Sequence, residues 1–564
     1  MEALDWLVIG VFFLALIGII VWVVRQKQND SADYFLGGRD ATWLAIGASI
    51  FASNIGSEHL IGLAGAGASS GMAMAHWEIQ GWMILILGWV FVPFYSRSMV
   101  YTMPEFLERR YNPQSRTILS VISLVSYVLT KVAVTVYAGG LVFQQVFGIK
   151  ELWGIDFFWI AAIGLVVLTA LYTIFGGMKS VLYTSVLQTP ILLLGSLIIL
   201  VLGFKELGGW DEMMRVCGAV TVNDYGDTMT NLIRSNDDAN FPWLGALIGS
   251  AIIGFWYWCT DQFIVQRVLS GKNEKEARRG TIFGAYLKLL PVFLFLIPGM
   301  IAFALHQKYI GAGGEGFLPM LANGTANADA AFPTLVAKLL PAGVKGLVVC
   351  GILAALMSSL ASLFNSSAML FTIDFYKRFR PETPEKKLVG IGQIATVVIV
   401  ILGILWIPIM RSVGDVLYTY LQDVQSVLAP GIAAAFLLGI CWKRTSAQGG
   451  MWGLIAGMII GLTRLGAKVY YSNAGEVADS TFKYLFYDMN WLFFCGWMFL
   501  FCIIVVIVVS LATEAPTAEK IQGLVFGTAT KEQKAATRVS WDHWDIIHTV
   551  IILAITGAFY WYFW

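Results

Sequence analysis

The feature that most constrains the fold of this chain is a series of apolar segments, each about 20 residues long, that recurs along the whole sequence. Hydrophobic residues make up 58% of the 564 residues and charged residues only 13%, whereas soluble domains carry roughly 25% charged residues. A helix of about 20 apolar residues is long enough to cross the hydrocarbon core of a bilayer. The pattern therefore predicts an all-α polytopic membrane protein of the cell membrane, surrounded by the lipid bilayer.

The apolar segments predict about 14 transmembrane helices. Their approximate ranges are 5–24, 41–68, 73–96, 117–147, 155–175, 182–203, 243–267, 280–305, 343–372, 388–410, 415–440, 451–471, 490–512 and 544–563. Clusters of Lys and Arg occur on alternate connections between these segments, beginning at Arg25. Because basic residues concentrate on the cytoplasmic side of a membrane protein, we expect both the N-terminus and the C-terminus outside the cell.

In the second segment the polar string NIGSEH (54–59) interrupts an otherwise apolar stretch. Lipid offers no partner to backbone groups that leave a helix, so such a break persists where it is buried in protein or lines a cavity. A second polar interruption, GFWYWCTDQ (254–262), falls in the seventh segment, five helices later. Paired broken helices at corresponding places predict two inverted repeats of five helices, with a transport site where the breaks face each other.

This pairing divides the chain into five parts. They are an N-terminal extra helix and cytoplasmic loop (1–40), a first inverted repeat (41–203), an extracellular loop (204–242), a second inverted repeat (243–440) and three peripheral C-terminal helices (441–564). In the ten-helix core that results, the first and sixth helices are the discontinuous ones.

Several polar side chains lie within the predicted membrane helices. They are His59, Glu78, Lys131, Asp261, Lys288 and Gln422. Each costs free energy in a bilayer unless it is paired or hydrated, so function is the default interpretation, although any one alone is as compatible with a helix–helix contact. Together they offer donors and acceptors with little net charge, which favours a neutral polyhydroxyl solute. Trp77 and the aromatic run 256–258 lie beside them and could pack on the C–H faces of a sugar, although a lone tryptophan is more often an interfacial or core residue.

A second cluster of oxygen atoms is predicted next to the first break. Ser358 and Ser359 follow Ala355 by three and four residues, so the three residues share one helix face. Their oxygens could join carbonyls freed at Ala52 and Ile55 by the break. Five oxygens without a carboxylate suit a weakly held monovalent cation such as sodium. By itself, a pair of serines in a membrane helix more often indicates helix packing.

The composition argues against several other functions. A formal net charge of +1 provides no basic surface that would favour a nucleic-acid partner. The six cysteines show no metal or redox spacing. Because no paired carboxylates, nucleophile–base pair or metal motif is evident, we do not expect an enzyme.

Longer strings in the sequence closely resemble the sodium/solute symporter family, specifically its sodium–glucose cotransporter branch. They are FASNIGSEH (51–59), WYWCTDQ (256–262) with IVQR (264–267), SSLASLFNS (358–366), and APGIAAAFLLG (429–439) with WKR (442–444). The resemblance runs from residue 33 to about residue 465 and continues more loosely to the end. The chain lacks the long insertion before the last helix that animal members have, which favours a bacterial source.

The resemblance implies a sodium-coupled secondary active symporter that imports a neutral monosaccharide of the glucose or galactose type by alternating access, on a LeuT-like core. It implies a substrate site made of Asn54, His59, Glu78, Tyr257, Trp258, Lys288 and Gln422. In this comparison Tyr257 closes the site from the inside, and Trp77 and Tyr418 close it from the outside. The implied sodium site comprises Ala52, Ile55, Ala355, Ser358 and Ser359.

Three positions depart from the pattern of the relatives. Ser185 stands where relatives commonly have an aspartate linked to a second cation, so we expect one sodium per sugar. Gly254 replaces a threonine of glucose carriers, and Gly81 replaces a serine of a galactose carrier, which leaves the sugar itself open. The alternatives are a carrier of myo-inositol or of another sugar derivative such as a sialic acid, or a sugar-gated sodium channel or sensor.

Overall fold

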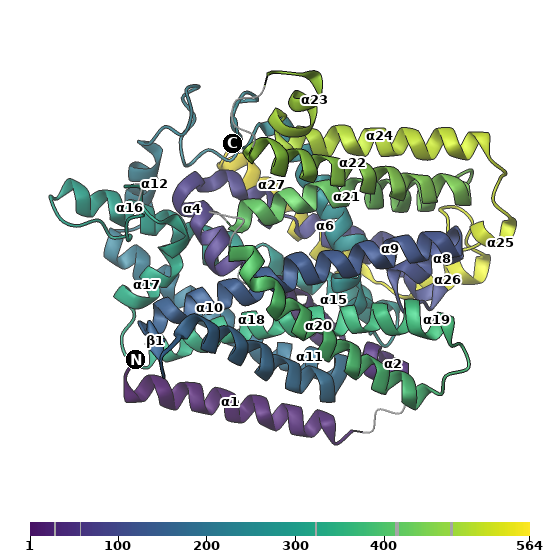
Figure 1. Cartoon of the computed structure of the whole chain (residues 1–564), viewed down its shortest axis with the longest axis horizontal. Helices are drawn as coiled ribbons and strands as arrows, with labels where there is room; N and C mark the ends of the chain where they lie inside the picture. Colours follow the sequence, from purple (N-terminus) through teal and green to yellow (C-terminus); the bar gives the residue numbers. More distant parts are fainter. Residues whose placement is uncertain (27–29, 57, 322–323, 412–416, 474–477) are drawn as a thin grey trace.

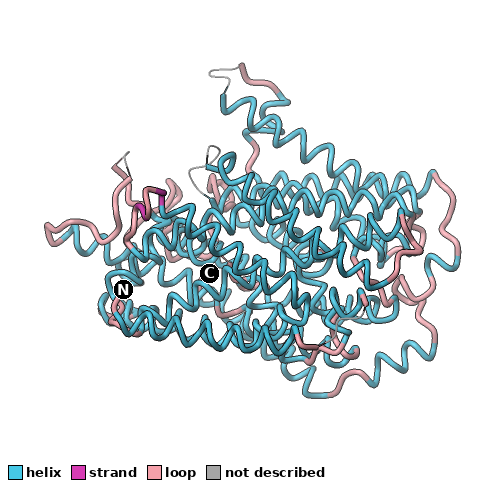
Figure 2. The backbone as a smooth tube through the Cα atoms, turned by 60° about the horizontal axis from the view of Figure 1, so that its bottom comes forward, coloured by secondary structure: helices cyan, strands magenta, loops and turns pink. Residues whose placement is uncertain are grey.

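Long helices that run roughly parallel to one another make up most of the structure (Figure 1). The structure, a computed structural model, describes residues 1–26, 30–56, 58–321, 324–411, 417–473 and 478–564. Within these ranges the paired strands form a single short hairpin, β1 (Glu151–Leu152) with β2 (Ile155–Asp156) (Figure 2). The predicted all-α architecture is confirmed.

Residue 242 precedes the second predicted repeat and separates the α-helices into two groups. Those before it are α1 Ala3–Val24, α2 Ser31–Leu36, α3 Trp43–Asn54, α4 Ala64–Ser70, α5 Ala75–Glu78, α6 Gly81–Ile86, α7 Val92–Ser98, α8 Met103–Arg110, α9 Pro113–Ser126, α10 Ala133–Phe147, α11 Phe157–Leu207 and α12 Trp210–Gly218. Those after it are α13 Trp243–Gly254, α14 Gln262–Leu269, α15 Glu274–Lys288, α16 Ile297–Gly311, α17 Ala331–Leu339, α18 Val344–Met369, α19 Lys377–Phe379, α20 Glu385–Arg411, α21 Leu417–Cys441, α22 Ala447–Asn473, α23 Thr481–Lys483, α24 Trp491–Ala512, α25 Ala518–Ile521, α26 Lys531–Val539 and α27 His543–Tyr562.

Eleven helices in the described part of the chain are long and apolar enough to cross a membrane. Two of these runs, Glu58–Ser98 with 41 residues and Phe157–Leu207 with 51 residues, would extend over roughly 60 Å or more at about 1.5 Å per residue. Each could therefore cross a bilayer core of about 30 Å twice. The count of 14 membrane helices stays a prediction.

The bend within α11 depends on a glycine. Gly177 adopts φ 52° and ψ −148° and separates two helical halves of α11. A side chain at this position would collide with the backbone carbonyl of Tyr34, and a positive φ is costly for residues other than glycine. The two halves correspond to the predicted spans 155–175 and 182–203.

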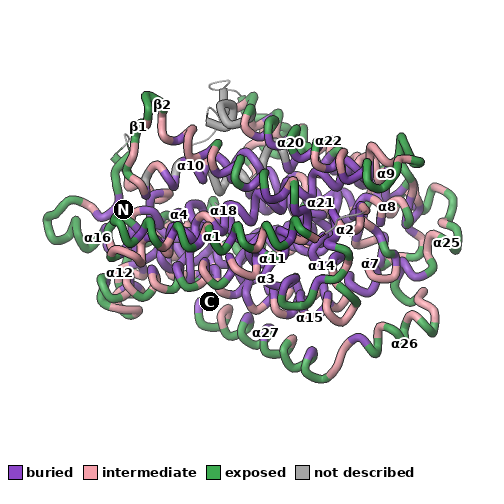
Figure 3. The backbone as a smooth tube through the Cα atoms, turned by 90° about the horizontal axis from the view of Figure 1, so that it is seen from below, coloured by how far each residue is buried: buried purple, intermediate pink, exposed green. Residues whose placement is uncertain are grey.

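The core of the molecule lies around α18 and α3, which are buried along most of their length (Figure 3). The apolar window of the run Val344–Phe379 is 89% buried, whereas that of α1 is only 22% buried. Helix α18 packs against α11 and α3, and α3 also packs against α15. The helices α21, α22 and α24 form a second packed group. The buried helices are those that carry the predicted sodium-site residues, and α1 presents most of its apolar surface outward.

Both chain termini lie toward the same end of the molecule (Figures 1 and 3). That end also carries α12 and α16, while α8, α25 and α26 lie toward the opposite end. This placement agrees with an even number of membrane crossings. Which end faces the cytoplasm stays a prediction.

Candidate functional site

The first predicted break is a genuine interruption of helical geometry. Helix α3 ends at Asn54, and Ile55 is extended, with φ −78° and ψ 109°. Helical structure resumes as a π-helical turn, Glu58–Leu63, while Ser57 lies outside the described residues. Wide π-helical turns are frequent at functional sites. Here the turn directs His59 toward the interior of the helix bundle.

The second predicted break has a different form. Helix α13 continues into a π-helical turn, Phe255–Thr260, which ends at Asp261 with an extended ψ of 127°. The Asp261 carboxylate then begins α14 by accepting a hydrogen bond from the backbone N–H of Phe263 at 3.2 Å. Such a side-chain cap satisfies a donor that would otherwise be unpaired at the helix start.

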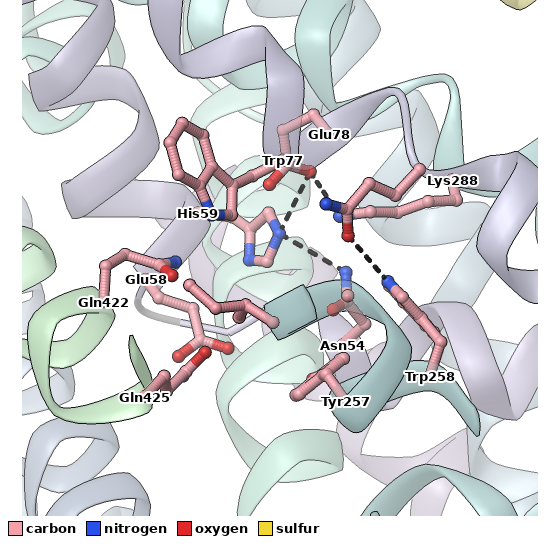
Figure 4. Close-up of a pocket in the computed structure, with 13 residues that line it drawn as sticks. Asn54, Glu58, His59, Trp77, Glu78, Tyr257, Trp258, Lys288, Gln422 and Gln425 are labelled. Carbon is pink, nitrogen blue, oxygen red and sulfur yellow. Dashed lines mark hydrogen bonds and ion pairs between the residues drawn. The ribbon is translucent and has the colours of Figure 1, made fainter. Parts of the chain in front are cut away.

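The two breaks meet at one small cavity with a free volume of about 40 Å³ (Figure 4). This volume is well below the roughly 300–1,000 Å³ of typical small-molecule sites, so the walls must separate before a monosaccharide can enter. The residues that line the cavity are Asn54, Glu58, His59, Trp77, Glu78, Gln80, Ile253, Gly254, Tyr257, Trp258, Lys288, Gln422 and Gln425. All seven residues predicted for the substrate site are among them, together with Trp77. Their assignment to a substrate remains a proposal.

A buried chain of polar contacts forms one wall of the cavity (Figure 4). Lys288 Nζ lies 2.6 Å from Glu78 Oε2, and His59 Nε2 lies 3.3 Å from the same oxygen. Asn54 Nδ2 lies 3.3 Å from His59 Nε2. An ionised Glu78 carboxylate only accepts hydrogen bonds, so we assign the proton of a neutral His59 to Nε2; in this tautomer the contact with Asn54 Nδ2 is not a hydrogen bond, because both groups are donors. The pairing neutralises most of the charge on this wall.

Three buried polar atoms on the cavity wall lack a hydrogen-bond partner in the described part of the chain. They are Trp77 Nε1, His59 Nδ1 and Gln422 Oε1. With His59 protonated on Nε2, they comprise one donor and two acceptors. Buried polar atoms in native proteins are nearly always paired, so a set of unpaired atoms on one cavity wall calls for an explanation.

Aromatic rings cover two sides of the cavity. Trp77 stacks on Trp491 at the start of α24, with ring centroids 5.5 Å apart, and its edge contacts Phe241 of the loop before α13. On another side, Tyr257 packs edge-on against Trp258 at 4.9 Å. Tyr418, the second predicted outer gate, lies in α21, and its side chain is outside the part that the structure describes.

Lys131 lies behind Tyr257 in a buried ion pair. Its Nζ is 2.7 Å from Asp261 Oδ2 and 4.7 Å from the centroid of the Tyr257 ring. The Tyr127 hydroxyl donates a hydrogen bond to the other carboxylate oxygen of Asp261. The residue that caps the second break is therefore paired with a cation, which explains why Lys131 and Asp261 are both tolerated within apolar helices.

The predicted sodium residues lie where α18 packs against the end of α3. The Ser359 hydroxyl donates to the carbonyl of Ser53 at 2.9 Å and to the carbonyl of Ile55 at 3.1 Å. Ala52 and Ala355 are buried in the same two helices. The break thus presents carbonyl oxygens to a serine hydroxyl, and Ser53 contributes one that the sequence analysis did not include.

Ser185 and Ser358 are neighbours at this site. Their hydroxyl oxygens are 3.4 Å apart, and Ser185 is 3.5 Å from the hydroxyl of Ser49. The strong hydrogen bond of Ser185 goes to the Val181 carbonyl, one turn earlier in its own helix, at 2.6 Å. A carboxylate is absent at this position, as the sequence shows.

Sequence reasoning missed Glu58, Gln80 and Gln425 as cavity-lining residues. Glu58 belongs to the first polar string, and Gln425 follows Gln422 by three residues on a helix, so both had a detectable signal. Gln80 had none of this kind, because helical spacing does not link it to Glu78. Helix α5 ends at Glu78, and Ile79 departs from helical geometry, with ψ 25°.

Comparisons with known proteins place this geometry in context. The chain matches the sodium:solute symporter family over residues 34–457. A sodium/myo-inositol cotransporter 2 from Mus musculus is 37% identical over 542 residues, covering 94% of this chain and 80% of that protein. A sodium/glucose cotransporter 4 from Danio rerio is 36% identical over 537 residues, covering 92% and 80%.

A solved structure shares the fold. A Na⁺-coupled sialic acid symporter, in a substrate-bound outward-open state, matches with a TM-score of 0.72 at 21% sequence identity, covering 92% of this chain and 99% of that one. This similarity confirms the predicted LeuT-like fold class. With the family match over residues 34–457 and relatives of 36–37% identity across nearly the whole length, the chain belongs to the sodium:solute symporter family.

Proposed function

We propose that this symporter couples the entry of sodium to the uptake of a neutral cyclic polyol, a monosaccharide of the glucose or galactose type or an inositol. The observation that carries this proposal is the set of unpaired atoms Trp77 Nε1, His59 Nδ1 and Gln422 Oε1 on one cavity wall. A hydroxyl group both donates and accepts hydrogen bonds, so a single polyol could satisfy the donor and the two acceptors together. An apolar solute would leave all three atoms unpaired.

The charges of the cavity favour a neutral solute over an anionic one. Its lining contains two carboxylates, Glu58 and Glu78, and one ammonium group, that of Lys288. Lys288 is already paired with Glu78 at 2.6 Å. A sialic acid would bring its own carboxylate into this setting, where the described lining residues offer no free cation to meet it, and burying an unpaired charge is costly.

Two polyols are candidates for the transported solute. Glucose or galactose is the expectation from the sequence strings described above. Myo-inositol is the second candidate, because relatives that are 37% and 36% identical to this chain are named sodium/myo-inositol cotransporters. Both are six-membered rings that carry several hydroxyls and apolar C–H faces, for which Trp258 and Tyr257 offer flat partners.

Sodium would bind beside the polyol at the same break. We propose that the ion is held by the carbonyls of Ala52, Ile55 and Ala355 and the hydroxyls of Ser358 and Ser359. Ser359 already contacts the Ile55 carbonyl, and rotation of its hydroxyl would turn a lone pair toward the ion. Because Asn54 and His59 flank the same break, sodium would order the groups that bind the polyol. Binding of each ligand would then strengthen binding of the other.

One sodium ion per polyol is enough for accumulation. A single charge crossing a potential of 100 mV supplies about 2.3 kcal/mol, or roughly fifty-fold accumulation before any sodium gradient is added. We propose that both termini and the side of Trp77 and Tyr418 face outward, and that Tyr257 closes the path to the cytoplasm. Alternating access then exposes the cavity to each side in turn.

The experiment that tests this function is counterflow and net uptake in proteoliposomes. Labelled glucose, galactose, myo-inositol and N-acetylneuraminic acid are compared with and without a sodium gradient. We expect sodium-dependent accumulation of one or more neutral polyols and none of the acid. Sodium current without polyol accumulation would indicate the channel alternative, and uptake that is independent of sodium would refute the proposal.

A further inference from the structure

Gln80 lies at a position that the substrate-site prediction did not include. It is 3% exposed and lines the cavity between the two breaks. Its side-chain Nε2 donates to the Ser250 carbonyl at 2.8 Å, and its Oε1 accepts a hydrogen bond from Trp258 Nε1 at 3.2 Å. A carbonyl only accepts and an indole N–H only donates, so the two partners together determine which way the amide faces.

The amide of Gln80 packs directly on Gly254. Ser250, Gly254 and Trp258 follow one another at intervals of four residues, so they share a face of the broken helix. A Cβ atom built on Gly254 would lie 2.5 Å from Gln80 Oε1, 2.9 Å from its Cδ and 3.0 Å from its Nε2. A side chain at position 254 and a glutamine amide in this place therefore exclude each other.

The two contacts use half of the amide's hydrogen-bonding capacity. A glutamine amide has two N–H donors and an oxygen with two lone pairs. One N–H is directed at Ser250 and one lone pair at Trp258, which leaves one donor and one acceptor. A hydroxyl group complements this pair because it donates and accepts, whereas a ring oxygen only accepts and a methylene does neither.

We propose that Gln80 is a specificity-determining residue that recognises one hydroxyl of the transported polyol, and that glycine at position 254 is required to admit it. This inference rests on the proposed function and deepens it. A site that hydrogen-bonds a substrate hydroxyl discriminates strongly against analogues that lack it, because its own buried groups are then left unpaired.

The test is a substrate-by-mutant cycle. Uptake of the labelled polyol that the wild-type protein accumulates is inhibited by its monodeoxy analogues, each lacking one hydroxyl. We expect Gln80→Ala to lower the apparent affinity for the parent polyol by about tenfold. The variant should also lose the discrimination against one deoxy analogue only. Gln425→Ala, which alters another glutamine of the cavity wall, is the matched control. This variant should still discriminate against the same deoxy analogue.

A structural role for Gln80 predicts a different result. If Gln80 only positioned Trp258, Gln80→Ala would lower the apparent affinity for the parent polyol and for every deoxy analogue by the same factor. That result would overturn the proposal. Sodium-dependent uptake by the wild-type protein reports separately on the proposed function. If the wild-type protein accumulates no neutral polyol, both proposals fail; if it accumulates one but the selective effect is missing, only the role of Gln80 fails.

A rescue experiment guards against loss of folding. We expect Gly254→Ala to abolish the same discrimination, since the new methyl group displaces the amide. The double variant Gln80→Ala/Gly254→Ala should transport better than Gly254→Ala alone, because the truncated residue 80 frees the space that the methyl group needs. Additive losses in the double variant would contradict the exclusive packing of the two side chains.

Discussion

The two broken helices look alike in sequence but differ in what they present to the site. The first break leaves helical geometry at Ile55 and offers backbone carbonyls to Ser359. The second widens into a π-helical turn and ends at a carboxylate, Asp261, which is paired with Lys131. The first break is thus suited to a cation and to polar groups of a solute, whereas the second supplies aromatic faces that a charge pair holds in place. A polar interruption in a membrane helix therefore does not have one meaning; its partners decide which chemistry it supports.

The largest effect is expected from removing the charge that holds the second break. Asp261→Ala leaves Lys131 buried without its carboxylate and removes the cap of α14. We expect a loss of stability of about 3–5 kcal/mol, measured by thermal unfolding of the purified protein in detergent. The double variant Asp261→Ala/Lys131→Met, without either charge, should recover much of the loss. A single variant as stable as the wild type would show that the second break does not depend on this pair.

The next effect concerns the cation at the first break. Ser359→Ala removes the hydroxyl that contacts the Ile55 carbonyl. We expect the sodium concentration for half-maximal uptake to rise by about ten- to a hundred-fold, as for the loss of one bond to a charged group. Ser362→Ala is the matched control, because Ser362 contacts the Ser53 hydroxyl at 2.6 Å and not a carbonyl. Equal shifts in both variants would argue against a cation at the carbonyls.

A smaller effect should separate the two roles proposed for the first break, which are sodium binding by its carbonyls and polyol binding by its side chains. His59→Phe keeps an aromatic ring but removes the unpaired Nδ1 and the contact with Glu78. We expect KM for the polyol to rise by about tenfold while the sodium requirement at saturating polyol changes little. The measurement is initial uptake over a matrix of polyol and sodium concentrations. If the variant lost sodium dependence instead, His59 would not act on the polyol alone, and the two roles of the break would not be separate.

The smallest effect is expected at Ser185. Its hydroxyl bonds to Val181 within its own helix and lies 3.4 Å from Ser358. We expect Ser185→Ala to change the apparent sodium affinity by about twofold or less, with one sodium still transported per polyol. The ratio of charge movement to labelled uptake measures this stoichiometry. A ratio near two charges per polyol in the wild-type protein would refute the expectation of a single ion.

Much of the site could be predicted because its residues belong to local strings. Asn54 and His59 mark the first break, and Tyr257 and Trp258 mark the second, because the two strings interrupt apolar segments; the roles expected of these residues came from the family resemblance. Lys131 was recognised as an expensive residue, but its role depended on Asp261, 130 positions away in the sequence. Gln80 was missed because it packs on Gly254, which is distant in the sequence, and follows a non-helical residue, so no helical periodicity connects it to the site.

The amino-acid sequence by itself determined that the chain crosses membranes and where its helices break. Both properties follow from the cost of placing polar groups and free backbone in lipid, which any short segment reveals alone. Only the tertiary structure decided which polar atoms are paired and which face the cavity. Glu78 is held by Lys288, whereas Trp77 Nε1 has no such partner in the described part of the chain. Pairing depends on distances between side chains far apart in sequence, and those distances exist only after the helices have packed.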